Sequence, residues 1–401
     1  MRICILSQGR LEFAGVVESY MKLLSFWLLK RKYEVILIDR SLFKIRMVSP
    51  LDIQLNNKKI LRLPEPIYII GLFILGLITV LMIILENKKR RIDLIHATDS
   101  GYAGLTAILV SKLVGIPSCI SVHSYRKFLL GVHLKSIVGR IILYFDSLIE
   151  RFVYSNADKI IALNDSIKSY ILSFGVDHSK VVKVPIAIQT NAFEKSKKYI
   201  GNKGIIQSNK VIIGYVGRLE PEKNLLSLLY AFKEVAMIKQ NVYLYLIGDG
   251  SLRNQLEKYA KLAKISNKVC FLGMQSNTPF WFAKFDIFVL PSLTEGMPFV
   301  LLEAMAAGKA IVASNIPAIK EMVRNGKEAL LFDPYSPEQL KEAVLKLYHN
   351  PELRRELGEN AKKKAKQYDI GVVFPKIVEV YQEVLRNKNI NDTRKYVRKV
   401  G

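Results

Sequence analysis

Short apolar runs alternate with longer stretches of helical periodicity along the whole chain. The runs are continuously hydrophobic, which is typical of strands buried on both faces of a parallel sheet. Their alternation with helices predicts βαβ units and an α/β fold. The predicted strands are residues 3–7, 34–38, 94–96, 118–122, 159–163, 181–184, 211–216, 242–247, 269–272, 287–290, 310–313 and 329–332. The clearest predicted helices are residues 225–237, 252–262, 299–307 and 337–348.

Between residues 188 and 210 the chain is polar and rich in lysine, which makes this stretch the best candidate for a linker. It separates an N-terminal domain, residues 1–188, from a C-terminal domain, residues 205–370, and each is long enough to bury its own core. In such folds ligands bind at the carboxyl ends of the parallel strands. We therefore expect a binding cleft between the two domains.

Half of the residues are hydrophobic and 24% are charged, which excludes a disordered chain, a collagen-like chain and a disulfide miniprotein. The 60 Lys and Arg residues outnumber the 35 Asp and Glu residues and give a formal net charge of +25. This charge favours anionic partners, namely phosphates, nucleic acids or acidic lipid headgroups. Cys4, Cys119 and Cys270 lie in apolar runs without metal-ligand spacing, as buried thiols do in a reducing compartment.

The densest chemical signal is the segment 291–308, PSLTEGMPFVLLEAMAAG. A predicted strand ends near Ser292 and a helix begins near Pro298, so the N-terminus of that helix forms an anion site at the carboxyl edge of the sheet. Two carboxylates, Glu295 and Glu303, lie on either side of this site. A carboxylate beside an anion site is favourable when it accepts hydrogen bonds from hydroxyl groups, which sugars and riboses supply.

A second segment places two cations after the strand at 211–216 and before the next helix. Arg218 and Lys223 lie in the sequence GRLEPEKN. Two cations balance the charge of a diphosphate, which suits a site for the pyrophosphate of a nucleotide.

In order and spacing, these segments resemble the family-4 glycosyltransferases, which are retaining enzymes of the GT-B fold. The matching pieces are GRLEPEKNLLSLLYAF, LIGDGSLRNQLE, KVCFLG and TEGMPFVLLEAMAAGKAIVAS with its E-x7-E spacing. The resemblance implies two Rossmann-like, doubly wound domains facing a central cleft. It also implies that residues 371–401 contain a C-terminal helix that returns to the N-terminal domain, followed by a basic tail.

The resemblance also assigns roles to particular residues. Arg218 and Lys223 are expected to hold the donor diphosphate, Glu295 the donor sugar and Glu303 the ribose hydroxyls. The remaining donor-binding positions are Gly15 in the first loop, Gly273 and Met274 near the base, and the backbone of Gly296, Met297, Pro298 and Phe299. His123 matches a histidine that lies near the donor sugar. Glu295, His123, Arg218 and Lys223 form the expected catalytic set.

The function expected from this resemblance is that of a retaining hexosyltransferase, which moves a sugar from a nucleotide-sugar to an acceptor hydroxyl. No Asp-x-Asp motif accompanies the site and two cations can stabilise the leaving diphosphate, so no metal ion or other cofactor is expected. The alternatives are a sugar-nucleotide epimerase, a phosphorylase, or a non-catalytic basic binding protein on the same scaffold. No nucleic-acid partner is expected, because the basic residues are dispersed and no such motif is present.

Residues 67–85 contain no charged side chain, and basic residues flank both ends of this segment. Strands predicted before and after it must pair in one sheet, so we expect it to enter one leaflet without crossing the bilayer. A re-entrant helix, an interfacial helix and a buried helix remain open alternatives. The protein is therefore expected in the cytoplasm, attached peripherally or monotopically to an anionic membrane surface, where a lipid-linked glycan or polysaccharide precursor is the acceptor.

Overall fold

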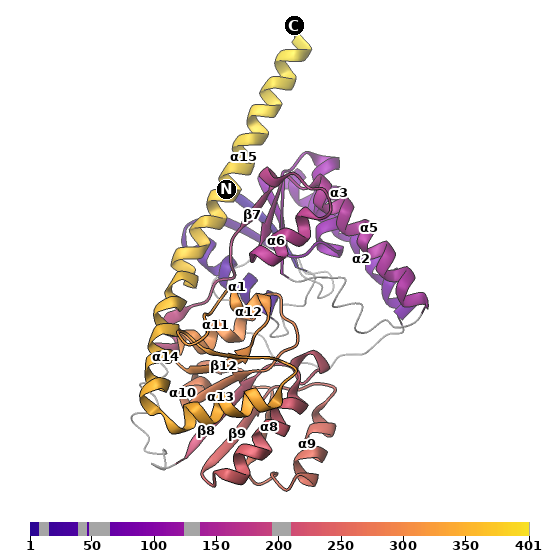
Figure 1. The fold of residues 1–401 in the computed structure, drawn as a ribbon. Coiled ribbons are helices and arrows are strands. Elements are labelled where there is room, and N and C mark those ends of the chain that lie inside the picture. The colour runs from indigo at the N-terminus through magenta and orange to yellow at the C-terminus, as the bar shows by residue number, and fades with distance from the viewer. Residues whose placement is uncertain (8–15, 39–45, 48–64, 124–136, 195–209, 401) are drawn as a thin grey trace. The chain divides into compact units, whose positions relative to one another are not determined.

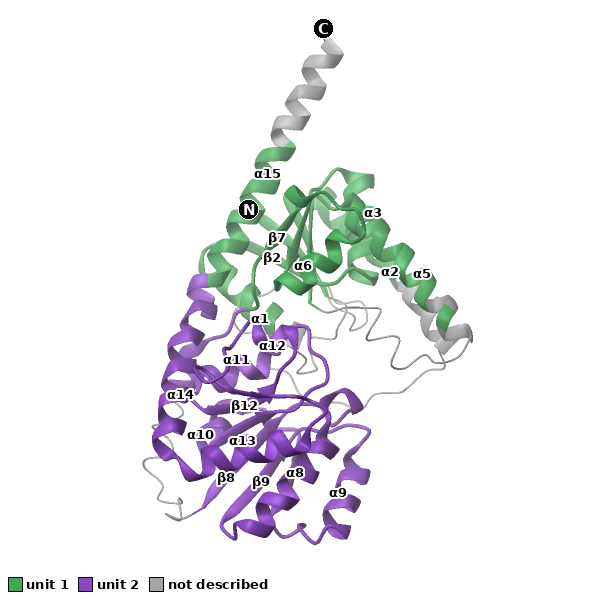
Figure 2. Cartoon of the chain, in the orientation of Figure 1, with its two compact units in different colours: residues 1–186, 373–401 green, residues 187–372 purple. Residues whose placement is uncertain are grey.

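The computed structural model describes residues 1–7, 16–38, 46–47, 65–123, 137–194 and 210–400. The chain forms two compact units (Figure 2). Unit 1 comprises Met1–Ile186 together with Val373–Gly401, and unit 2 comprises Ala187–Val372.

Unit 1 is built on one sheet that is flanked by helices (Figure 1), and its strand order is β3-β2-β1-β4-β5-β6-β7. Its strands are β1 (Arg2–Leu6), β2 (Glu34–Ile38), β3 (Arg46–Met47), β4 (Leu94–Ala97), β5 (Ser118–Val122), β6 (Lys159–Ala162) and β7 (Val181–Lys183). Its helices are α1 (Val16–Lys30), α2 (Glu65–Lys89), α3 (Tyr102–Val114), α5 (Ile137–Asn156), α6 (Asp165–Leu172), the 3₁₀ turn η1 (His178–Lys180) and most of α15 (Ile370–Val400). All pairs are parallel except β2 with β3.

Unit 2 contains a parallel sheet with the strand order β10-β9-β8-β11-β12-β13. Its strands are β8 (Val211–Val216), β9 (Val242–Ile247), β10 (Val269–Gly273), β11 (Ile287–Leu290), β12 (Ala310–Ser314) and β13 (Leu330–Phe332). Its helices are η2 (Pro221–Lys223), α8 (Leu225–Ile238), α9 (Arg253–Leu262), α10 (Thr278–Lys284), α11 (Phe299–Ala306), α12 (Pro317–Lys320), α13 (Pro337–His349), α14 (Pro351–Ala365) and η3 (Lys366–Tyr368).

The strand order reverses direction between β8 and β11, and in unit 1 between β1 and β4. In doubly wound sheets the loops at such a reversal diverge to opposite faces and leave a crevice at the carboxyl edge. The loops after β8 and β11 are therefore the natural place for a ligand in unit 2.

Several strands are buried along their whole length, because helices cover both faces of each sheet. Every residue of β1, β4, β5 and β6 is buried, as is every residue of β11 and β12. This burial is why the sequence shows continuous apolar runs, and the predicted α/β class is confirmed. The strand β3 was not predicted, since two residues are too few to show a pattern.

The helix α15 completes the core of unit 1, although it lies far along the chain from the strands it covers. Phe374 and Tyr381 are fully buried there, and Lys159 at the start of β6 pairs with Glu383 at 2.6 Å. The expected return of the C-terminal helix to the first domain is thus confirmed.

The predicted linker at 188–210 includes residues 195–209, which lie outside the described residues.

Candidate active site

Three loops at the carboxyl edge of the unit 2 sheet lie in direct backbone contact through glycines. Gly217 after β8 has φ 154°, and Gly248 after β9 has φ 131°. A Cβ atom built on Gly248 would lie 1.8 Å from the carbonyl oxygen of Gly217, so only glycine fits at this contact. The Gly248 N–H also donates to the Gly273 carbonyl at the end of β10, over 2.8 Å. The predicted position Gly273 therefore belongs to the same loop cluster, and the next residue, Met274, is exposed.

The backbone of Arg218 is fixed, while its guanidinium reaches into solvent. The hydroxyl of the buried Tyr215 donates to the Arg218 carbonyl over 2.8 Å. The Arg218 side chain is 58% exposed and pairs with Glu222 at 2.7 Å. The cation is thus presented at the sheet edge and held there by a carboxylate of the following turn.

Lys223 and Glu295 join the loop after β8 to the loop after β11. The Lys223 ammonium lies 2.7 Å from Glu295 Oε1, and the Ser292 hydroxyl donates to the same oxygen over 2.7 Å. The backbone reinforces this contact, because the Leu293 N–H donates to the Glu222 carbonyl over 2.9 Å. Sequence reasoning assigned no role to Ser292.

Each of the two expected diphosphate-binding cations therefore already has a carboxylate partner. The four side chains Arg218, Glu222, Lys223 and Glu295 sum to zero charge before any donor is present. A diphosphate at this edge must either displace the carboxylates or draw its stabilisation from the N-terminus of α11.

The helix α11 begins at Phe299, the last of the predicted contact residues. Pro298 is its N-cap residue and provides no side-chain hydrogen bond to the first turn. The first N–H groups of a helix lack intrahelical acceptors and point along the axis, so this end favours an anion. Met297 is buried beside it, while Gly296 and Phe299 are partly exposed.

Glu303 lies inside α11 and is 8% exposed. Thr278, the first residue of α10, donates its hydroxyl to Glu303 Oε1 over 2.6 Å. Burial raises the pKa of Glu303 to about 7, and the hydrogen bond from Thr278 opposes this rise. Glu303 is therefore a buried carboxyl group and not a solvated helix residue. Thr278 is a further position that the motif did not reveal.

His123 follows the carboxyl end of β5 in unit 1. Within the described residues neither of its ring nitrogens has a hydrogen-bond partner, and both are buried. The edge of the Tyr20 ring packs against it, with ring centroids 5.3 Å apart. Burial lowers the pKa of His123 to about 4, so the imidazole is neutral near pH 7. A neutral imidazole with both nitrogens unsatisfied is suited to hydrogen bonding with hydroxyl groups.

A second histidine, His96 on β4, has both of its ring nitrogens satisfied inside the core. Nδ1 lies 2.6 Å from the Tyr381 hydroxyl and Nε2 lies 2.6 Å from the Ser121 hydroxyl. Burial lowers the pKa of His96 to about 3, and the neighbouring His123 contributes to this shift. His96 therefore anchors α15 to the sheet, and no motif marks Tyr381 as its partner.

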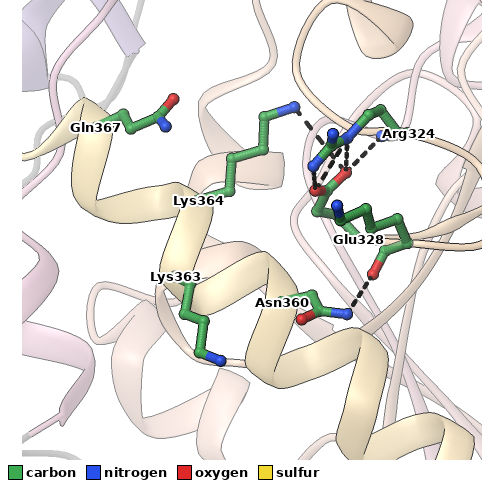
Figure 3. A pocket seen from close by; sticks show the side chains of 7 residues that line it. Arg324, Glu328, Asn360, Lys363, Lys364 and Gln367 are labelled. Carbon is green, nitrogen blue, oxygen red and sulfur yellow. Dashed lines mark hydrogen bonds and ion pairs between the residues drawn. The ribbon is translucent and has the colours of Figure 1, made fainter.

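A pocket in unit 2 is lined by other residues than these (Figure 3). It is formed by the turn that precedes β13 and by α14, so it belongs to the amino edge of the sheet. Glu328 is buried there and pairs with Arg324, while Lys364 lies 3.9 Å away. Asn360 Nδ2 donates to the Lys327 carbonyl over 3.0 Å. These contacts fix the turn against α14.

Gly15 lies outside the described residues. Among the residues that the structure describes, no group of three or more His, Cys, Asp or Glu side chains could hold a metal ion.

Comparison with known proteins identifies the family. The model named Glycosyltransferase Family 4 matches residues 17–192, and the model named Glycosyl transferases group 1 matches residues 196–364. The UDP-Gal:alpha-D-GlcNAc-diphosphoundecaprenol alpha-1,3-galactosyltransferase of Escherichia coli is 26% identical, over 75% of this chain and 78% of its own length.

Two solved structures show the fold. Sucrose-phosphate synthase from Thermosynechococcus elongatus superposes with a TM-score of 0.79 at 17% identity, over 96% of this chain and 100% of its own. HepE of Anabaena in complex with UDP-glucose superposes with a TM-score of 0.71 at 19% identity, over the same shares. The expected GT-B fold is confirmed. Because the two family models together account for most of the chain, this protein belongs to the family-4 glycosyltransferases.

Proposed function

We propose that this glycosyltransferase moves a hexose from a nucleotide-sugar to a hydroxyl group of a lipid-linked glycan or polysaccharide precursor, with retention of anomeric configuration. The observation that carries the proposal is the ion pair of Lys223 with Glu295 beside the N-terminus of α11. It brings together a cation for phosphate, a carboxylate for sugar hydroxyls and a helix end for anionic charge.

In the proposed reaction the bond between the anomeric carbon and the diphosphate oxygen breaks on the face where the acceptor oxygen bonds. The acceptor hydroxyl transfers its proton to the departing diphosphate, so no protein base is required. Negative charge on the diphosphate grows in the transition state, and Arg218, Lys223 and the N-terminus of α11 stabilise it. The exchange of Glu295 for a phosphate at Lys223 releases the carboxylate to accept hydrogen bonds from the donor sugar.

Two further groups complete the proposed donor site. Glu303 accepts hydrogen bonds from the ribose hydroxyls, and its burial beside Thr278 holds it in one position. His123 supplies a neutral hydrogen-bonding group for the sugar, since its two ring nitrogens lack partners among the described residues.

No divalent ion is required in this proposal, because the paired cations at Arg218 and Lys223 take over the charge neutralisation that a metal would provide. The name of the E. coli relative specifies a diphosphoundecaprenol-linked acceptor, which supports a lipid-linked acceptor here. The proposed location is the cytoplasmic face of a membrane, with peripheral or monotopic attachment through residues 67–85. In the part of the chain with described side chains, no helix has the length and apolarity to span a bilayer.

The test begins with a thermal-shift screen of nucleotide-sugars, because a ligand that binds the native state raises its apparent stability. Transfer from the best donor to a lipid-diphosphate acceptor is then followed by NMR, which reports the anomeric configuration of the new linkage. Retention supports the proposal. Inversion, or release of an epimer or a sugar phosphate in place of a glycoside, overturns it. Nucleic-acid binding without any donor binding identifies a non-catalytic binding protein instead.

A further inference from the structure

The second half of α2 has one buried edge and one exposed apolar edge. Thr79 and Ile83 are buried, and the Thr79 hydroxyl lies 2.8 Å from the Tyr102 hydroxyl of α3. Leu77, Leu81 and Leu85 are each at least half exposed and are spaced by four residues, so they form one stripe. The helix therefore lies flat along α3 and presents a row of leucines to its surroundings.

The helix α3, which packs beside α2, and the helix α5, which packs beside α3, also expose large apolar side chains. Helix α3 contacts both α2 and α5, and the three lie together in unit 1 (Figure 1). On α3 Leu113 is 69% exposed, and on α5 Tyr144 and Phe145 are 63% and 59% exposed. We define the exposed surface of α2, α3 and α5 as the three-helix face. Large apolar side chains gathered on one surface mark an interaction site rather than ordinary scatter.

The charged residues of the three-helix face have one sign. Among the described side chains of these helices the carboxylates are turned inward: Glu150 is 1% exposed, Asp146 is 8% exposed and Glu86 is held by Arg2 at 2.9 Å. Exposed cations remain, namely Lys88, Lys89, Lys112, Arg140 and Arg151. The Lys112 ammonium lies over the Phe152 ring, 5.2 Å from its centroid, so cation and apolar surface are intermixed. The face thus combines exposed leucines and aromatics with positive charge.

We propose that the three-helix face docks flat on a bilayer that contains anionic lipid. Leucine and aromatic side chains enter the boundary between headgroups and acyl chains, while the cations bind the headgroups. A second copy of the chain is a poorer occupant, because two like-charged faces repel each other. The purpose of this docking, access to a lipid-linked acceptor, rests on the proposed function, but the docking itself is measurable without turnover.

The experiment compares two triple variants of the full chain. The first carries Leu81→Glu, Leu113→Glu and Phe145→Glu on the three-helix face. The matched control carries Met237→Glu, Leu262→Glu and Tyr335→Glu, three positions in unit 2 that are each more than 70% exposed. Both variants change the net charge equally, and both replace exposed apolar side chains. Thermal unfolding with donor present verifies that each variant retains its fold.

Binding is measured by sedimentation with vesicles of phosphatidylcholine alone and of phosphatidylcholine with phosphatidylglycerol. We expect wild type and control to sediment with the anionic vesicles. The face variant should lose about 1000-fold in partition coefficient, given roughly tenfold for each of its three half-buried apolar side chains. Added salt should weaken the anionic component.

Three results overturn the proposal: wild type remaining in the supernatant, equal loss in both variants, or wild type forming a dimer that only the face variant disperses. Membrane docking and the proposed function can fail separately. The face variant should still bind the donor, which shows that its loss of vesicle binding is not a loss of the donor site. Failure of the proposed function would appear as absent transfer even to a soluble acceptor.

Discussion

Lys223 and Glu295, 72 positions apart in the chain, form an ion pair of 2.7 Å in which both side chains are largely buried. The pair links the loop after β8 to the loop after β11, on the two sides of the point where strand order reverses. It therefore preforms the candidate donor site but also competes with the donor, since Lys223 cannot hold a phosphate and Glu295 equally well.

Lys223→Ala is expected to lower the rate of transfer about 10²–10³-fold, because one stabilising contact to the leaving diphosphate is lost. Lys233→Ala is the matched control, since Lys233 is a partly exposed lysine of α8 that, among the described residues, forms an ion pair with its neighbour Glu234 alone, at 4.0 Å. Initial rates at saturating donor measure the effect. Equal transfer rates for Lys223→Ala and Lys233→Ala would show that Lys223 does not belong to the donor site. Arg218→Ala and Glu295→Ala should behave as Lys223→Ala does.

Donor binding should weaken as the pH falls below the pKa of Glu303, which burial raises to about 7. The protonated acid accepts fewer hydrogen bonds from ribose hydroxyls, so the donor dissociation constant should rise by up to about tenfold per pH unit below that pKa. Thr278→Val removes a hydrogen bond that lowers the pKa, so it should move the fall in affinity to higher pH. Glu303→Gln should bind weakly with no such pH dependence. Calorimetric titrations at a series of pH values provide the measurement, and a flat wild-type profile contradicts the assignment.

The raised pKa of Glu303 also affects the stability of the fold, and this effect has the opposite pH dependence to donor binding. The pKa of Glu303 in the folded protein exceeds its ordinary value of 4.5, so the folded state binds the proton more tightly than the unfolded state does. Its contribution to the free energy of unfolding is therefore greatest at low pH and declines as the pH rises towards 7.

Gly248→Ala should destabilise unit 2 by more than about 3 kcal/mol, because strained backbone and a clash with the Gly217 carbonyl act together. Gly115→Ala separates the two causes. Gly115 also has a positive φ, 77°, but no atom lies within 4 Å of its built Cβ. It should lose only about 1 kcal/mol. If thermal unfolding shows similar losses of stability for both variants, the close contact with the Gly217 carbonyl does not add to the cost of the strained backbone.

Tyr381→Phe should destabilise unit 1 by about 1–3 kcal/mol, because it leaves a buried ring nitrogen of His96 without its partner. Tyr335→Phe, at a site that is 79% exposed, should have no measurable effect. Thermal unfolding measures both. If the two variants unfold at the wild-type temperature, the hydrogen bond at 2.6 Å does not contribute to stability.

His123→Ala should lower turnover about 10–100-fold through loss of a hydrogen bond to the bound sugar. Since the pKa of His123 is about 4, its removal should leave the pH–rate profile between about 6 and 8 unchanged in shape. A missing limb in the variant profile would instead assign His123 a proton-transfer role.

The strands of both sheets could be predicted from the sequence, because a parallel strand buried on both faces consists of consecutive apolar residues. The burial of Glu303 was also foreseeable, since its neighbours Leu301, Leu302, Ala304 and Met305 are apolar. The contact of Lys223 with Glu295 could not be predicted, because it depends on β8 lying beside β11. The order of strands in a sheet does not follow from the local pattern of apolar and polar residues.

The three-helix face escaped prediction for a related reason. Tyr144 and Phe145 in α5 are large aromatic residues of the kind that sequence alone assigns to a core. Only the packing of α5 against α3 shows that their side chains point outward. The segment 67–85, which was expected to enter one leaflet, lies within α2, one of the three helices of this proposed surface.

The bond between His96 and Tyr381 also fixes an order of events during synthesis. The two residues are separated by 285 positions, so the first sheet leaves the ribosome long before the helix that covers it is translated. Residues 187–372 are made in between, and unit 2 can complete its core while unit 1 still lacks α15. The unit begun first is thus finished last, and the surface that Phe374 and Tyr381 later cover is, in that interval, a site for chaperones and for misassembly.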